Sequence, residues 1–122
     1  MAEVWVCRED ALQDGVVRMA RLGCDEDGLP IIALLLRDQT GAIVAYRNLC
    51  RHLSVPLDGG TGQLLSEDGQ HLVCGTHGAA YRLQDGYCVE GPCQGLALHR
   101  LHVRDECGDL YVSDAPVAHS TV

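Results

Sequence analysis

Several features that define other classes of protein are absent from this sequence. The longest apolar run covers residues 31–36, far short of the roughly 20 residues that a membrane-spanning helix needs. Basic residues number 9, all of them arginine, against 17 acidic residues, so the net charge is −8. Nucleic acids and anionic membrane surfaces both require a basic footprint on the protein. We therefore expect neither a nucleic acid nor a membrane as a partner.

An export signal is also missing from the N-terminal residues. Residues 1–7 show no basic segment, no apolar segment and no pair of arginines of the kinds that direct a chain to export. The 7 cysteines are many for 122 residues, but their number is odd. Metal binding explains them better than a framework of disulfides does. We expect a cytoplasmic protein.

Helix signals are almost missing, and short β-branched runs alternate with Asp-Gly and Thr-Gly turns, which is typical of an all-β domain. The length predicts a single domain over residues 1–122. We expect an antiparallel β-sandwich or open barrel with long loops at one end. One helical turn is expected over residues 11–14 and a C-terminal extension over residues 113–122. The predicted strands cover residues 4–7, 16–21, 31–37, 42–47, 63–66, 71–74, 80–83, 98–103 and 110–112.

Two short Cys/His pairs lie in loops between the predicted strands: Cys50-Arg51-His52 and Cys74-Gly75-Thr76-His77. Together they offer two thiolates and two imidazoles, which is enough to hold a metal centre. Both a zinc ion and an iron–sulfur cluster accept such ligands. Structural zinc loops usually separate both ligands of a pair by two or more residues, so the Cys-x-His spacing is cramped for one tetrahedral ion. This spacing disfavours zinc without excluding it.

The order of the two pairs and the residues around them resemble the Rieske family of [2Fe–2S] proteins. Residues 46–52 resemble the entry from a strand into the first ligand loop, and Pro56-Leu57 matches the Pro-Leu that follows it. Residues 74–81 match the second ligand loop, with an aromatic residue four positions after the histidine. Gly91-Pro92-Cys93 resembles the proline loop that covers the cluster, and residues 108–112 resemble the closing strand.

The resemblance implies both a fold and a site. The fold is a Rieske-like sandwich or open barrel with a small cluster-binding subdomain at one end, whose loops occupy about residues 48–93. The site is one [2Fe–2S] cluster with Cys50 and Cys74 on one iron and with His52 and His77 on the other. Further residues that the resemblance places around the cluster are Leu53, Gly75, Gly78, Tyr81 and Pro92.

Departures from the respiratory-chain members of that family indicate which branch of the family this chain resembles. Val55 and Thr76 stand where those proteins carry a pair of disulfide-forming cysteines, and Ala79 stands where they carry a serine that donates to a sulfide. Tyr81 matches their tyrosine, whose hydroxyl donates to a ligand thiolate. Because such donors raise the reduction potential, the resemblance implies a soluble ferredoxin of low to intermediate potential. Residues 64–73 are expected to form an inserted hairpin.

The other cysteines are expected to be buried thiols that pack as small apolar side chains: Cys7, Cys24, Cys88, Cys93 and Cys107. A disulfide between Cys88 and Cys93 is an alternative, although two packed thiols fit a reducing cytoplasm better. Ordinary strand or surface positions are expected for His71, His99 and His102.

The resemblance implies a one-electron carrier with no catalytic site of its own. Its expected partners are redox proteins: it would pass electrons from a reductase to an oxygenase-type enzyme, with its acidic surface facing a basic docking patch. The length leaves no room for the second domain of a Rieske oxygenase. Two alternatives stay open: a small redox subunit of a larger oxidoreductase, as in nitrite reductases, and a zinc-stapled interaction module.

Overall fold

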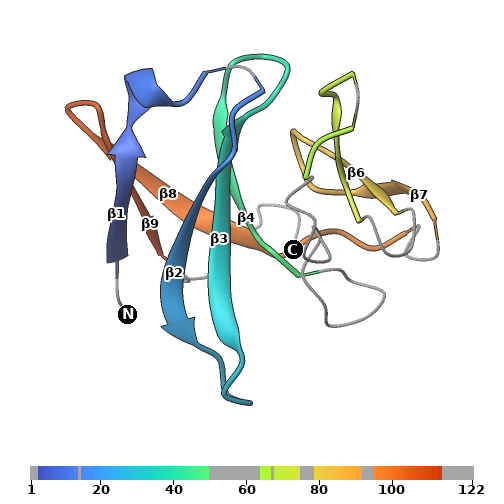
Figure 1. Ribbon diagram of the computed structural model, residues 1–122, viewed down its shortest axis with the longest axis horizontal. Helices are drawn as coiled ribbons and strands as arrows, with labels where there is room; N and C mark the ends of the chain where they lie inside the picture. The colour runs from blue at the N-terminus through green and yellow to red at the C-terminus, as the bar shows by residue number, and fades with distance from the viewer. Residues whose placement is uncertain are drawn as a thin grey trace.

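The computed structural model describes residues 3–13, 15–49, 64–66, 68–74, 79–91 and 95–113. This part of the chain contains nine β-strands, one short 3-10 helix and no α-helix. The strands form one antiparallel sheet of six strands and one of three. Figure 1 shows the small sheet beside the large one, on the side of strand β4. The prediction of an all-β fold is confirmed.

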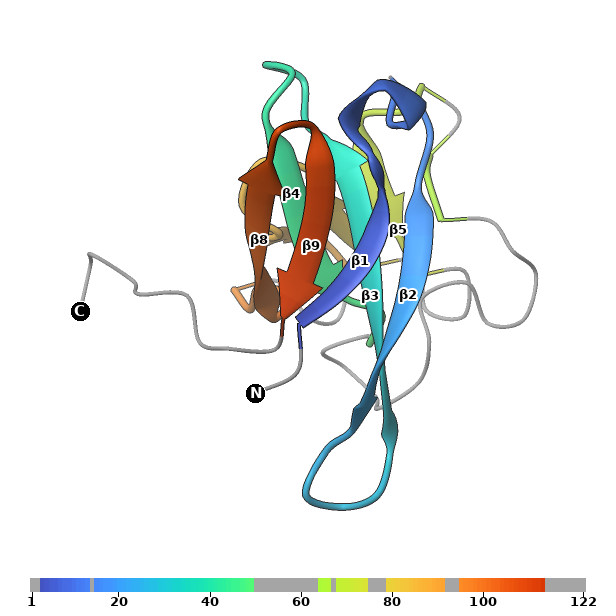
Figure 2. The same ribbon diagram turned by 90° about the vertical axis from the view of Figure 1, so that its left-hand side faces the viewer.

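The large sheet curls into an open barrel. Its strands follow the spatial order β1-β9-β8-β4-β3-β2, and β1 and β2, at the two ends of that order, lie against each other (Figure 2). The predicted helical turn is displaced toward the N-terminus, since the 3-10 helix spans Glu9–Ala11. The strands are β1 Glu3–Arg8, β2 Arg18–Cys24, β3 Pro30–Arg37, β4 Ile43–Arg47, β8 Arg100–Glu106 and β9 Asp109–Ser113.

The small sheet has the order β5-β6-β7, with β5 at His71–Val73, β6 at Ala80–Arg82 and β7 at Cys88–Glu90. The sequence predicted β5 and β6 but not β7, which lies directly before the predicted proline loop at residues 91–93. The predicted hairpin is confirmed: Leu65 pairs with Leu72, and the Val73 N–H donates to the Leu64 carbonyl oxygen at 2.9 Å. Within the described residues, the predicted strand 63–66 is reduced to this single bridge.

Strand β3 is buried on both of its faces. Ile31, Ala33 and Leu35 point into the core of the barrel, whereas Leu34 and Leu36 belong to a second core between the two sheets. Side chains alternate between the faces of a strand, so a strand that is buried on both faces reads as a continuous apolar run. This explains the run at residues 31–36.

Tyr46 of strand β4 joins the two sheets. Its side chain is fully buried, and its hydroxyl donates to the Leu83 carbonyl oxygen at 2.6 Å, just after β6. Gly86, with φ of +72°, lies against the Tyr46 ring so closely that a Cβ atom there would be 2.8 Å from Cε1. The small sheet therefore packs on the large one at a contact that only glycine fits.

Two of the cysteine predictions are wrong. Cys7 and Cys88 are buried as expected, but Cys24 and Cys107 are exposed. Cys24 ends the edge strand β2, and Cys107 sits in the β8–β9 turn with φ of +53°, so neither side chain faces a core. Cys93 lies outside the described residues. In the described part of the chain, no helix is long and apolar enough to cross a membrane.

Candidate metal centre

Two of the predicted site residues, Cys74 and Tyr81, lie in the described part of the chain. The others lie outside the described residues: Cys50, His52, Leu53, Gly75, His77, Gly78 and Pro92. Both predicted ligand loops nevertheless start from described strands. Arg47 ends β4 three positions before Cys50, and Val73 ends β5 directly before Cys74.

Cys74 lies fully buried at the point where β5 ends. Its backbone N–H donates to the carbonyl oxygen of Ala79 at 2.8 Å, and the neighbouring pair Val73 and Ala80 is in register between β5 and β6. The second ligand loop therefore begins and ends at adjacent points of one antiparallel pair. This closed base fixes the position from which the loop leaves the sheet, and burial keeps water away from the Cys74 sulfur.

Tyr81 lies on the same face of the small sheet as Cys74. It pairs with Leu72 across β5 and β6, and residues 72 and 74 project to the same side because side chains alternate along a strand. Both Cys74 and Tyr81 are fully buried members of the core between the sheets. The position of the phenol agrees with the role that the Rieske resemblance implies for it, a donor to a ligand thiolate.

The base of the first ligand loop is held by the large sheet. The Arg47 N–H donates to the His99 carbonyl oxygen at 2.9 Å, the Asn48 N–H to that of Ile32 at 2.8 Å, and the Leu49 N–H to that of Arg47 at 2.8 Å. Asn48 is itself buried. These contacts anchor the chain to β3 and to the segment before β8 just ahead of Cys50.

An ion pair that the sequence did not predict lies at this base. The Arg47 guanidinium lies 2.8 Å from the Asp25 carboxylate in the β2–β3 turn. The hydrogen bond from Arg47, with further ones from the Leu29 and Asp27 N–H groups, lowers the pKa of Asp25 below its ordinary value. The sequence offered one signal, an acid at the first position of the turn Asp25-Glu26-Asp27-Gly28, but it predicted only a turn.

The donor set fits an iron–sulfur centre better than a hard cation. Two thiolates and two imidazoles are soft and borderline ligands, which suit iron–sulfur clusters and zinc rather than magnesium or calcium. Cys74, the one predicted ligand among the described residues, is a buried thiol at the start of a loop. Among the described residues, no three His, Cys, Asp or Glu side chains form a metal site.

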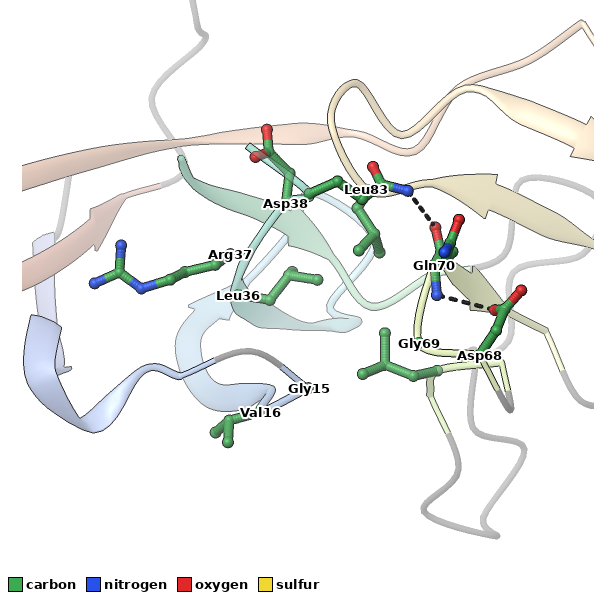
Figure 3. A pocket seen from close by; sticks show the side chains of 11 residues that line it. Gly15, Val16, Leu36, Arg37, Asp38, Asp68, Gly69, Gln70 and Leu83 are labelled. Carbon is green, nitrogen blue, oxygen red and sulfur yellow. Dashed lines mark hydrogen bonds between the residues drawn. The ribbon is translucent and has the colours of Figure 1, made fainter. Parts of the chain in front are cut away.

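A pocket of about 270 Å³ lies at the junction of β3 and the inserted hairpin (Figure 3). Its polar groups are already engaged: the Gln39 side chain donates to the Gln70 carbonyl oxygen at 3.4 Å, and the Gln70 N–H to Asp68 at 3.0 Å. Arg37 donates to three backbone carbonyl oxygens, and Figure 3 shows it pointing away from Asp68 and Gln70. We interpret this pocket as the seam where the hairpin packs on the large sheet.

The chain matches the family model of the Rieske [2Fe–2S] domain over residues 2–102. It therefore belongs to the Rieske [2Fe–2S] domain family. This membership confirms the predicted family and implies the predicted cofactor, a [2Fe–2S] cluster. A search of curated protein sequences finds no match for this chain.

Several solved structures of similar fold come from the carbazole 1,9a-dioxygenase system. A chain in the complex of reduced oxygenase and oxidized ferredoxin has a TM-score of 0.68 at 21% identity, and the match covers 96% of this chain and 97% of that one. The ferredoxin from Nocardioides aromaticivorans IC177 has a TM-score of 0.64 at 24% identity, with 96% and 100% covered. The terminal oxygenase from Novosphingobium sp. KA1 has a TM-score of 0.68 at 20% identity, but only 30% of its chain is covered against 95% of this one.

Proposed function

We propose that this chain is a one-electron carrier of the Rieske ferredoxin type, a single domain over residues 1–122 that works in the cytoplasm between a reductase and an oxygenase-type enzyme. The observation that carries the proposal is Cys74, a predicted cluster ligand that lies fully buried at the closed base of its loop in a Rieske domain. The match to a complete ferredoxin chain, 100% of which is covered, supports it.

The proposed ligands are Cys50 and Cys74 on one iron, and His52 and His77 on the other. When bound, the [2Fe–2S] cluster supplies one-electron redox chemistry. The chain itself provides the two ligand loops, within about residues 48–93, and a buried phenol at Tyr81 on the Cys74 side of the small sheet. Residues proposed to surround the site are Leu53, Gly75, Gly78 and Pro92.

The proposed partners are redox proteins with a basic docking surface. With 17 acidic and 9 basic residues, the chain is strongly negative, and opposite charge on a partner speeds encounter and selects the right partner. One of the similar structures is a complex between an oxygenase and a ferredoxin. This likeness favours an oxygenase component as the acceptor of the electron.

Metal and sulfide analysis of the protein purified without oxygen tests the cofactor. We expect two iron and two acid-labile sulfide per chain, together with a Rieske-type EPR signal after reduction. One zinc per chain without sulfide would refute the proposal and support the zinc-stapled module.

A second measurement tests the carrier role. Stopped-flow spectroscopy should show one electron taken up from a reductase and then passed on to an oxygenase component, each step slowing as salt increases. Co-purification as a fixed subunit of a large flavin or haem chain would instead support the small-subunit alternative.

A further inference from the structure

The ion pair between Asp25 and Arg47 differs from the other ion pairs of the described residues. Its side chains are 14% exposed for Arg47 and 21% exposed for Asp25, whereas every side chain in the other four pairs is at least 32% exposed. Salt and water screen a part-buried pair less than an exposed one. Its charges therefore act more strongly on their surroundings than those of the surface pairs do.

Asp25 is a rigid anchor because its carboxylate also shapes the turn in which it lies. Its Oδ1 atom accepts hydrogen bonds from the N–H groups of Asp27 and Leu29, both at 2.9 Å. Its Oδ2 atom accepts the hydrogen bond from Arg47 at 2.8 Å. The carboxylate cannot leave Arg47 by rotation without also breaking the hydrogen bonds that form the tip of the β2–β3 hairpin.

Stability alone is a poor explanation for Arg47. Its Nε atom is buried and has no hydrogen-bond partner among the described residues, and a buried donor without a partner costs free energy. Part-buried ion pairs contribute little net stability, because desolvation offsets their attraction. The position of Arg47 suggests another role, since it lies three residues before Cys50 and three residues of chain span at most about 11 Å.

We propose that Asp25 is a positioning residue for the cluster site. Asp25 holds Arg47 at the base of the first ligand loop and balances the positive charge of Arg47 there. This inference rests on the proposed function, because it requires a cluster bound through Cys50. A positive charge near an iron–sulfur cluster favours the reduced state, and a negative charge favours the oxidised state. The two charges of the pair largely cancel, and removing either one leaves the other uncompensated.

Opposite shifts of the reduction potential test the proposal. Asp25→Asn keeps an oxygen for the Asp27 and Leu29 N–H groups but removes the negative charge, so the potential should rise. Arg47→Gln removes the positive charge, so the potential should fall. Each shift should reach at most about tenfold in the one-electron equilibrium, which is 59 mV. Protein-film voltammetry at low salt measures both shifts, and the double variant should return close to the wild-type potential.

Two further variants separate this role from a general effect of charge or packing. Glu3→Gln removes the same charge from the exposed pair with Arg104, and it should shift the potential far less than Asp25→Asn does. Arg47→Lys keeps the positive charge and a donor, so it should stay near the wild-type potential. A loss of packing alone would shift the reduction potentials of Asp25→Asn and Arg47→Gln in the same direction.

Several outcomes would overturn the inference. The first is an equal shift of the reduction potential for Asp25→Asn and Glu3→Gln, and the second is a shift of the same sign for Asp25→Asn and Arg47→Gln. The third is a double variant whose potential does not return close to the wild-type value. A folded Asp25→Asn protein that loses its iron would support the positioning role. If Asp25→Asn does not fold, equal potentials for Arg47→Gln and Arg47→Lys overturn the inference and a lower potential for Arg47→Gln supports it. A wild-type chain without iron and sulfide refutes the proposed function instead, before any variant is compared.

Discussion

The two sheets of this protein differ in how much of their own structure they can support. The six strands of the large sheet are five to eight residues long and enclose a core of their own. Each strand of the small sheet has three residues, and its buried side chains share a core with the large sheet. Short strands need such a covering surface to be stable. The large sheet is thus the scaffold, and the small sheet, which leads into the Cys74 loop, depends on it.

The largest expected effect comes from removing Cys74, a proposed cluster ligand. Cys74→Ser should abolish cluster binding, because a serine hydroxyl is a poor substitute for a thiolate on iron. Without the cluster, amide protection should fall in β5, β6 and β7 while it persists in β3 and β4. Iron analysis and hydrogen–deuterium exchange measure the two effects.

Cys88→Ser is the matched control for this variant. Cys88 is buried in the same core, and its thiol donates to the Glu90 carbonyl oxygen at 3.1 Å, a hydrogen bond that serine can also make. It should keep its iron. Wild-type iron content in Cys74→Ser, or equal loss of protection in both sheets, would contradict the comparison.

The contact between the sheets can be broken at Gly86. Gly86→Ala adds a Cβ atom 2.8 Å from the Tyr46 ring in a left-handed backbone conformation, so we expect a loss of about 2–4 kcal/mol in unfolding free energy. Gly69→Ala is the control, because Gly69 has the same φ of +72° with nothing within 4 Å. It should lose only about 1–2 kcal/mol. Urea unfolding measures both, and equal losses would show that the contact does not matter.

Tyr46→Phe tests the same contact more gently. It removes the hydroxyl that donates to the Leu83 carbonyl oxygen and leaves that buried acceptor without this donor, so we expect a loss of about 1–3 kcal/mol. Burial raises the pKa of the Tyr46 hydroxyl above its ordinary value of 10.0. The unfolded state ionises above about pH 10, whereas the buried hydroxyl of the folded state stays neutral. The difference in unfolding free energy between Tyr46→Phe and wild type should therefore stay constant up to about pH 10 and shrink above it.

Tyr87→Phe provides the control for Tyr46→Phe in a urea-unfolding series. Tyr87 is 39% exposed, and its substitution should change the unfolding free energy by less than about 0.5 kcal/mol. A Tyr46→Phe loss as small as that of Tyr87→Phe would argue against the hydroxyl as a link between the sheets.

The smallest effect is expected at Asp38, in the β3–β4 turn of the scaffold. Burial alone would raise the pKa of this carboxyl, but hydrogen bonds from the Thr40 hydroxyl and from the Thr40 and Ala42 N–H groups outweigh it, and the pKa lies below its ordinary value of 3.8. A lowered pKa stabilises the folded state above the ordinary value, and this stability is lost as the pH falls through the folded-state pKa.

Asp38→Asn should accordingly cost about 1 kcal/mol at pH 7 and have less effect as the pH falls below 4. Urea unfolding at pH 7, 5 and 3.5 measures this trend, and exchange in β5 to β7 should not change. Asp27→Asn removes the same charge from the exposed β2–β3 turn and serves as the control. A difference in unfolding free energy between Asp38→Asn and wild type that grows toward low pH would contradict the lowered pKa of Asp38.

The local features of the fold could be predicted because they depend on neighbouring residues. The apolar run at residues 31–36 predicted β3, and Gly28 and Gly41 marked turns in which both have positive φ. Strand β7 was missed, although β5 and β6, which are equally short, were predicted; its pairing with β6 shows only in the fold. Cys24 and Cys107 were predicted to be buried on the average behaviour of cysteine, but their exposure depends on an edge strand and a turn.

The sequence by itself determined the family and the proposed chemistry. The two Cys/His pairs and their spacing are local patterns, and the resemblance to Rieske proteins rests on them. Only the tertiary structure decided what surrounds them. Tyr46 reaches Leu83 across 37 positions, and Asp25 lies 22 positions from Arg47 in the chain. Such contacts form because the folded sheets bring distant segments together and exclude water between them, and no local pattern in the sequence records that.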